Sequence, residues 1–203
     1  ADQHHVQRLV IMGPEARFEV DQAVDCECHD AGPIIPDGAN APPNAVRRYT
    51  VSDLRDPKAK RVSLIGAPTD VGAGTRGASM GPEALRVARL QAMLESQGVE
   101  VQDRGNLQGP ANPGLPPLDG YRHLAEVAAW NRTAHDAFRA EFAAARLPIL
   151  LGGDHSLAIG SISAAARHCR ENGKELRVLW FDAHADANTH VLTPSGNIHG
   201  MPM

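Results

Sequence analysis

Several features that mark other classes of protein are scarce in this sequence of 203 residues, which has three cysteines, 4% aromatic residues and a net charge of −4. An odd number of cysteines argues against a disulfide framework and fits a reducing cytoplasm. Lysine and arginine form no stripe, and phosphate binding needs clustered positive charge. Nucleic acid is therefore not expected as a partner.

Long apolar runs are also missing. The longest, at residues 147–151 and 178–181, are too short to cross a bilayer. No charged segment followed by an apolar core opens the chain, so we expect neither a secretory signal nor a membrane partner. The hydrophobic fraction of 42% and the charged fraction of 22% are ordinary for a globular protein. We expect a cytoplasmic protein with one sizeable core.

Residues 1–57 differ in composition from the rest of the chain. They keep no period of 2 or 3.6 and have a proline-rich centre, which predicts a disordered N-terminal extension. Cys26, Cys28 and His29 lie close together, but structural zinc sites take four ligands, so no zinc site is expected there. Bacterial genes sometimes start on a valine codon, and the domain could begin at Val51. We hypothesise that residues 1–50 are not translated, the alternative being a genuine disordered extension.

Residues 58–203 alternate between strand and helix patterns and form the predicted domain. Strands are predicted at residues 61–68, 99–107, 148–151 and 176–182, and helices at residues 82–97, 121–146 and 157–172. Such a pattern, with nearly continuous apolar strands, predicts an α/β fold: a three-layer αβα arrangement with a parallel sheet. Parallel sheets usually have more strands, which suggests that C-terminal strands are missing from this chain. Trp130 and Trp180 are core candidates, whereas the histidines predicted on helices, among them His123, are expected near the surface.

Two polar motifs follow predicted strands. Gly-Gly-Asp-His-Ser contains His155, and Asp-Ala-His-Ala-Asp contains Asp182, His184 and Asp186. In extended backbone the last three side chains would share one face, at the carboxyl edge where open parallel sheets bind ligands. Two carboxylates and an imidazole, with His155 from another strand end, predict a metal site. Ligation by Asp and His without thiolate suits Mn, Zn, Fe or Co.

These two motifs and the later segment Ser-Gly-Asn-Ile-His-Gly-Met-Pro resemble the ureohydrolases, and the last segment resembles arginase in particular. The resemblance covers residues 61–203. It implies an arginase-like fold and two Mn²⁺ ions per active site. By this resemblance His155, Asp182 and Asp186 bind one ion, while Asp182 and His184 bind the second, with Asp182 bridging. The family's later Asp-x-Asp pair is absent from this sequence, which implies that the fragment alone is inactive.

The resemblance further implies hydrolysis of the guanidinium group of L-arginine to L-ornithine and urea by a metal-bridging hydroxide. Two metals can hold and orient hydroxide at neutral pH. Asp186 would stabilise the tetrahedral intermediate and steer its proton. His199 matches the family's proton-shuttling histidine, a task that suits an imidazole because it titrates near neutrality.

Substrate selection is assigned by the same resemblance to uncharged residues in the loop after the metal ligands. They would hold the α-carboxylate and α-amino end of arginine: Asn188, Thr193, Ser195 and Asn197. Alternatives are a hydrolase for agmatine or another guanidino compound, a zinc deacetylase, and an inactive fragment or interaction module. The family also implies a homo-oligomer, either a trimer or a hexamer.

Overall fold

The computed structural model describes residues 8–11 and 61–203. Three parallel strands form its central sheet in the order β3-β2-β4. They are β2 (Arg61–Ala67), β3 (Glu100–Asn106) and β4 (Leu147–Gly152). Val62 pairs with Val101 on one side and with Leu147 on the other, so β2 is the central strand. All three strands were predicted from the sequence to within one residue or two at each end.

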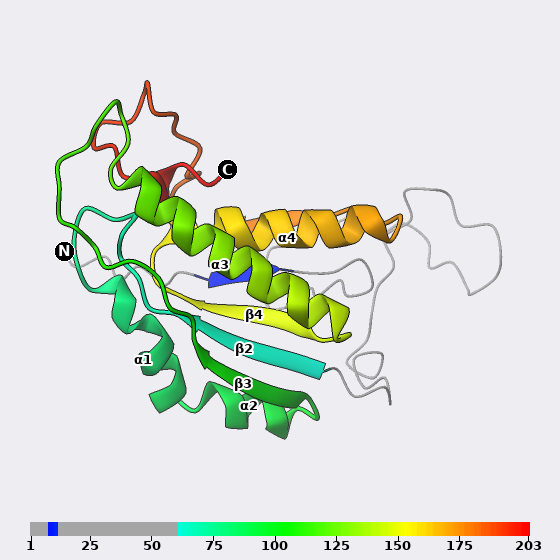
Figure 1. Ribbon diagram of the computed structural model, residues 1–203. Coiled ribbons are helices and arrows are strands. Elements are labelled where there is room, and N and C mark those ends of the chain that lie inside the picture. Colours follow the sequence, from blue (N-terminus) through cyan, green and yellow to red (C-terminus); the bar gives the residue numbers. More distant parts are fainter. Residues whose placement is uncertain (1–7, 12–60) are drawn as a thin grey trace, which may run out of the picture. The chain divides into compact units, whose positions relative to one another are not determined.

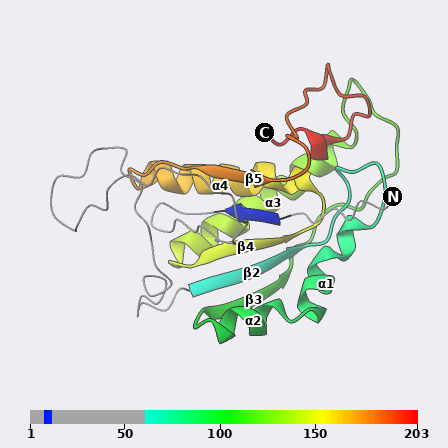
Figure 2. The same ribbon diagram turned by 180° about the vertical axis from the view of Figure 1, so that it is seen from behind.

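Helices cover both faces of this sheet (Figures 1 and 2). On one face lie α3 (Leu124–Ala143) and α4 (Ala158–Glu171), and on the other α1 (Gly81–Val87) and α2 (Leu90–Ser96). The alternation of side chains along β2 explains both contacts, because successive residues of a strand point to opposite faces. Leu64 packs in a cluster with Leu90 and Leu94 of α2, whereas Ile65 packs with Phe138 of α3 and Ala164 of α4. The predicted three-layer αβα fold is confirmed.

The single helix predicted at residues 82–97 is wrong. The chain forms two short helices separated at Arg89, whose φ of 61° is left-handed. Leu85, Ala88 and Ala92 fall at helical spacing in the sequence, but all three are exposed. The break turns Leu90 and Leu94 onto the sheet instead.

The fourth predicted strand exists as β5 (Val178–Phe181), but it is not part of the parallel sheet. It pairs antiparallel with β1 (Arg8–Ile11), with Leu9 opposite Trp180. A strand at residues 8–11 was not predicted, because four residues are too few to establish a period. Cys26, Cys28, His29 and Val51, with the hypotheses attached to them, lie outside the described residues.

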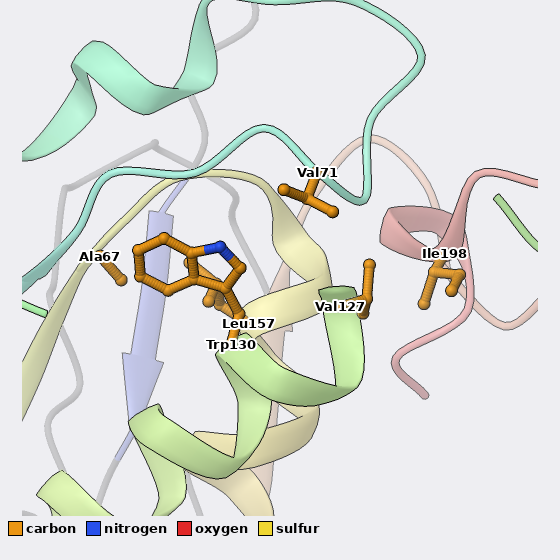
Figure 3. Close-up of a cluster of buried hydrophobic side chains, with 6 residues drawn as sticks. All are labelled: Ala67, Val71, Val127, Trp130, Leu157 and Ile198. Atoms are coloured by element: carbon orange, nitrogen blue, oxygen red, sulfur yellow. The ribbon is translucent and has the colours of Figure 1, made fainter. Parts of the chain in front are cut away.

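A cluster of buried hydrophobic side chains brings together residues from the end of β2, from α3 and from the loops beyond the strands (Figure 3). Trp130, 4% exposed, confirms its predicted place in the core and donates a hydrogen bond from Nε1 to the carbonyl oxygen of Pro110 at 2.9 Å. Ile198 comes from a short 3₁₀ helix, η3 (Ile198–Gly200), near the end of the chain. The whole cluster comprises Ala67, Val71, Val127, Trp130, Leu157 and Ile198.

A second buried group, polar in character, joins α3 to the sheet. The hydroxyl of Ser63 on β2 donates to Glu141 Oε2 at 2.6 Å and accepts from Arg146 Nε at 2.8 Å. Arg104 on β3 donates to both carboxylate oxygens of Glu141. Burial opposes the charge of Glu141, but the hydrogen bonds from Arg104 and Ser63 outweigh it and hold the pKa of Glu141 below its ordinary value.

Candidate metal centre

The first candidate ligand, His155, begins the 3₁₀ helix η2 (His155–Leu157) directly after β4. Gly153 makes the turn possible, because a Cβ there would lie 2.6 Å from the carbonyl oxygens of Ala67 and Thr69. Asp154 caps the new helix by accepting a 2.9 Å hydrogen bond from the N–H of Ser156. The polar side chains of this turn thus project from the carboxyl end of the parallel sheet.

His155 meets two carboxylates from the segment after β5. Its Nδ1 lies 2.9 Å from Asp182 Oδ2 and 2.7 Å from Asp186 Oδ2. The side chains of the two aspartates are 4% and 10% exposed, and that of His155 is 21% exposed. One potential ligand atom from each residue can be chosen such that all three lie within 4.8 Å of one another.

The aspartates do not converge in the way that the alternation rule suggests. β5 ends at Phe181, and residues 182–186 are not extended strand. Asp186 has a φ of 46°, in the left-handed region, and this turn brings its carboxylate back to His155. The side chain of His184 is 73% exposed, with Nδ1 3.5 Å from Asp182 Oδ1. The expectation that Asp182, His184 and Asp186 share an extended face is therefore wrong.

The three clustered residues fit a divalent metal ion. Metal–ligand bonds of about 2.0–2.2 Å place neighbouring ligand atoms about 3 Å apart, close to the separations between His155 and the two aspartates. One imidazole nitrogen cannot donate its single proton fully to two carboxylates, whereas a shared cation would satisfy both. The set of one nitrogen and several oxygens, without sulfur, suits manganese, iron, cobalt or zinc.

Trp180 closes one side of this group. Its ring lies edge-on to the His155 ring, with the centroids 5.6 Å apart. It is half-buried, and its Nε1 has no hydrogen-bond partner among the described residues although that atom is buried. Trp180 thus packs beside the candidate ligands. It was predicted to lie in the core, and it is only half-buried.

The predicted substrate loop is held by contacts within itself and to the start of α3. Thr193 Oγ1 accepts from the N–H of Gly196 at 3.0 Å, and Asn197 Oδ1 accepts from Arg122 Nε at 2.9 Å. Thr193 and Asn197 therefore shape the loop. Ser195 is exposed, but its Oγ also accepts a hydrogen bond from the N–H of Asn197 at 3.3 Å, and Asn188 is exposed as well.

His199 lies in η3, and its main-chain N–H donates to the carbonyl oxygen of Gly72 at 3.1 Å. The loop that contains Gly72 is itself fixed by Asp70, which accepts from Ser79 Oγ and Asn112 Nδ2. Burial works against the charge of Asp70, but the hydrogen bonds from Asn112, Gly77 and Ser79 prevail and lower its pKa. This glycine-rich loop thus lies against the segment that carries His199.

Sequence reasoning missed several residues that organise the site. His123 was expected near the surface, but it is 8% exposed. Its Nδ1 lies 2.9 Å from the carbonyl oxygen of Val71, and its Nε2 accepts from the N–H of Leu115 at 2.9 Å. Arg122 binds Leu115 and Asn197 in the same region. The hydrogen bonds to Val71 and Asn197 could not be predicted from the loop sequences, because each joins segments that are distant in the sequence. The position of Asp154 before a helix was the one signal available.

No helix among the described residues is long and apolar enough to cross a membrane.

Comparison of this sequence with known proteins identifies its family. Residues 60–203 match the model of the arginase family. The arginase of Brevibacillus brevis is 40% identical over 144 residues, which cover 71% of this chain and 47% of that protein. The chain therefore spans about half the length of the curated relatives it matches.

Solved structures agree. The arginase of Bacillus caldovelox is 40% identical with a TM-score of 0.65, covering 70% of this chain and 47% of its own. The arginase of Entamoeba histolytica, solved in complex with L-ornithine, is 32% identical with a TM-score of 0.60, covering 71% of this chain and 48% of its own. The resemblance predicted from the motifs and the fold predicted from the pattern are both confirmed. This chain belongs to the arginase family.

Proposed function

We propose that the whole protein to which this chain contributes hydrolyses the guanidinium group of L-arginine, giving L-ornithine and urea, with two bound Mn²⁺ ions. The observation that carries the proposal is the convergence of His155, which follows β4, with Asp182 and Asp186, which follow β5. The relatives named arginase support the same reaction, as does the relative solved with L-ornithine. His184 is proposed as a ligand of the second ion, with Asp182 bridging the two.

Bound divalent metal would supply a water of lowered pKa, oriented for attack. The guanidinium is delocalised and cationic, hence a poor electrophile, so orientation of the water matters. In this reaction the water oxygen would form a bond to the guanidinium carbon, and the bond from that carbon to the ornithine nitrogen would break. Asp186 would stabilise the tetrahedral intermediate and steer its proton, and His199 would deliver a proton to the departing amine.

The substrate end of the site is assigned to the loop after the ligands. Asn188 and Ser195, both exposed, would hydrogen-bond the α-carboxylate and α-amino groups of arginine. Thr193 and Asn197 would act by holding the loop, because their oxygens accept from Gly196 and Arg122. A hydrolase for agmatine is the second candidate, since a hypothetical agmatinase from Burkholderia thailandensis shares this fold with a TM-score of 0.51.

Urea release by the whole protein in Mn²⁺, with arginine and agmatine compared, tests this proposal. We expect kcat/KM for arginine to exceed that for agmatine by at least about 10-fold, because lost hydrogen bonds to the carboxylate cost about 1.5–3 kcal/mol. Equal or faster turnover of agmatine would favour the second candidate. Absence of urea from either would reject hydrolysis. The 203-residue chain alone is expected to be inactive, since its described residues bring only three candidate ligands together.

We also propose a cytoplasmic homo-oligomer, a trimer or a hexamer. The odd number of cysteines supports the compartment, and the assembly rests on resemblance to the family. Light scattering of the whole protein after size exclusion would give its mass, and a monomer would contradict the proposed assembly.

A further inference from the structure

Asp154 lies beside the candidate ligand His155 and is 6% exposed. Its two carboxylate oxygens serve different segments. Oδ1 accepts from the N–H of Ser156 at 2.9 Å, and Oδ2 accepts from the N–H of Gly72 at 2.8 Å. Helix capping alone needs one oxygen, which a serine or an asparagine supplies as well. The cap does not require Oδ2 of Asp154, which instead binds the N–H of Gly72.

Gly72 passes close to the turn that carries His155. A Cβ at residue 72 would lie 2.5 Å from Asp154 Oδ1 and 2.5 Å from Ser156 Oγ, so only glycine allows this approach. While its N–H faces Asp154, its carbonyl oxygen accepts the 3.1 Å hydrogen bond from the N–H of His199. Gly72 thus joins the two segments directly.

The main-chain N–H of His199 makes this contact, whereas its neighbours in the same turn have polar contacts of their own. Asn197 Oδ1 accepts from Arg122 Nε, and the carbonyl oxygen of Gly200 accepts from the N–H of Asn188. The residue at the start of η3, Asn197, makes no side-chain capping hydrogen bond.

Ile198 anchors the same turn on its apolar side, packed near Val71 and Val127 (Figure 3). Apolar packing limits how far a segment moves, but it is not directional. The bond to Gly72 is the directional constraint on the main-chain N–H of His199 itself.

We propose that Asp154 is a positioning residue that fixes, through Gly72, the main chain of His199 relative to the candidate ligand His155. The hydrogen bonds run from Ser156 to Asp154, from Gly72 to Asp154, and from His199 to Gly72. Metal binding at His155 is then coupled to the order of the His199 segment. The importance of this coupling for catalysis rests on the proposed function, in which His199 transfers a proton.

Amide hydrogen exchange in the 203-residue chain, measured by NMR, tests the proposal with the variant Asp154→Ser. Serine keeps the cap on Ser156 but is too short to reach Gly72. We expect exchange at His199 to quicken by at least 10-fold, while the core amides of Leu64 and Phe138 keep their rates. Asp103→Asn, which removes a carboxylate bound to Arg86 away from the site, is the control and is expected to leave His199 unchanged.

The second measurement repeats the exchange with Mn²⁺ present, and a chelator removes the paramagnetic ion before each spectrum. In the unaltered chain, Mn²⁺ is expected to slow exchange at His199, and in Asp154→Ser this slowing is expected to disappear. Should the serine variant not fold, Asp154→Asn provides the same comparison, because its amide group presents a donor to the N–H of Gly72. Unchanged protection of His199 in the variant that folds, without metal, would overturn the proposal. Failure of Mn²⁺ to bind would reject the metal site instead, and the metal-free exchange would still decide the role of Asp154.

Discussion

Asp186 illustrates what the sequence reveals at the scale of a single residue. The motif singles out Asp182, His184 and Asp186, and a metal site can be predicted from residue types alone. Which of them converge depends on the left-handed φ of 46° at Asp186, and aspartate tolerates that region better than most residues. The rule for extended strands therefore singled out two residues, Asp182 and Asp186, that cluster with His155, although their backbone is not extended. His184 is not in that cluster. The positions of His155 and of the two aspartates come from separate strands, and only the fold brings them together.

We predict that replacing Gly72 by alanine destabilises the fold, whereas the same replacement at Gly152 does not. Gly72→Ala would force a Cβ to within 2.5 Å of Asp154 and Ser156, while a Cβ at Gly152 would meet only Leu157, at 3.7 Å. Overpacking of this kind costs about 1–3 kcal/mol. Urea denaturation should show that loss in Gly72→Ala and a change below about 0.5 kcal/mol in the matched variant Gly152→Ala. Equal stability of the two variants would show that the approach of Gly72 to Asp154 is not close in solution.

At the scale of an element, the break between α1 and α2 leads to a second prediction. Arg89 is exposed and adopts a left-handed φ of 61°, which costs a residue with a side chain about 1–2 kcal/mol. Arg89→Gly removes that strain but loses chain entropy, so the free energy of unfolding should rise by up to about 1 kcal/mol. Arg132→Gly, in the middle of α3, should lower it by about 1 kcal/mol. A loss of stability in Arg89→Gly would mean that α1 and α2 form one helix.

The polar group between α3 and the sheet leads to a prediction about pH. The pKa of Glu141 is lowered in the folded state from its ordinary value of 4.5, so its charge stabilises the fold above that value. The contribution is lost as the pH falls through the lower, folded-state pKa. Glu141→Gln should cost about 1.5–3 kcal/mol at about pH 7, and the difference from the unaltered chain should shrink towards about pH 3.

Glu126→Gln, on the same helix, is the control for this measurement and should change stability little at either pH. Guanidinium denaturation at the two pH values gives the free energies. A cost for Glu141→Gln that stays constant between these two pH values would contradict the role assigned to the charge of Glu141.

Most elements could be predicted from the sequence because their patterns are local. β2 and β4 have apolar runs followed by proline or glycine, and α3 and α4 keep a helical period over many residues. β3 has no apolar run, but it begins just after Gly98 and alternates in exposure over residues 100–104. The prediction failed at residues 82–97, where a period of 3.6 continues across a break that only packing on the sheet imposes. It also failed for β5, which pairs with β1 and not within the parallel sheet, since pairing is decided by segments far apart in the sequence.

At the scale of the whole molecule, the described strands form two separate sheets. β4 pairs with β2, whereas β5 pairs with β1, and no hydrogen-bonded ladder joins β4 to β5 within the part of the chain described. The two halves of the candidate metal group nevertheless come from the ends of β4 and β5. Contact between His155 and the aspartates therefore does not require their strands to be neighbours. A bound cation would add a link between the two sheets.

Mn²⁺ binding to the chain, followed by the electron paramagnetic resonance of the free ion, tests the central claim most directly. The account predicts saturable binding that His155→Ala weakens by at least about 10-fold, while His135→Ala, a histidine on α3 away from the cluster, leaves it unchanged. Mn²⁺ at about 100 times its dissociation constant should also stabilise the fold by about 2.7 kcal/mol. Binding that is absent, or equally strong with and without His155, would contradict the assignment of His155, Asp182 and Asp186 as a metal centre.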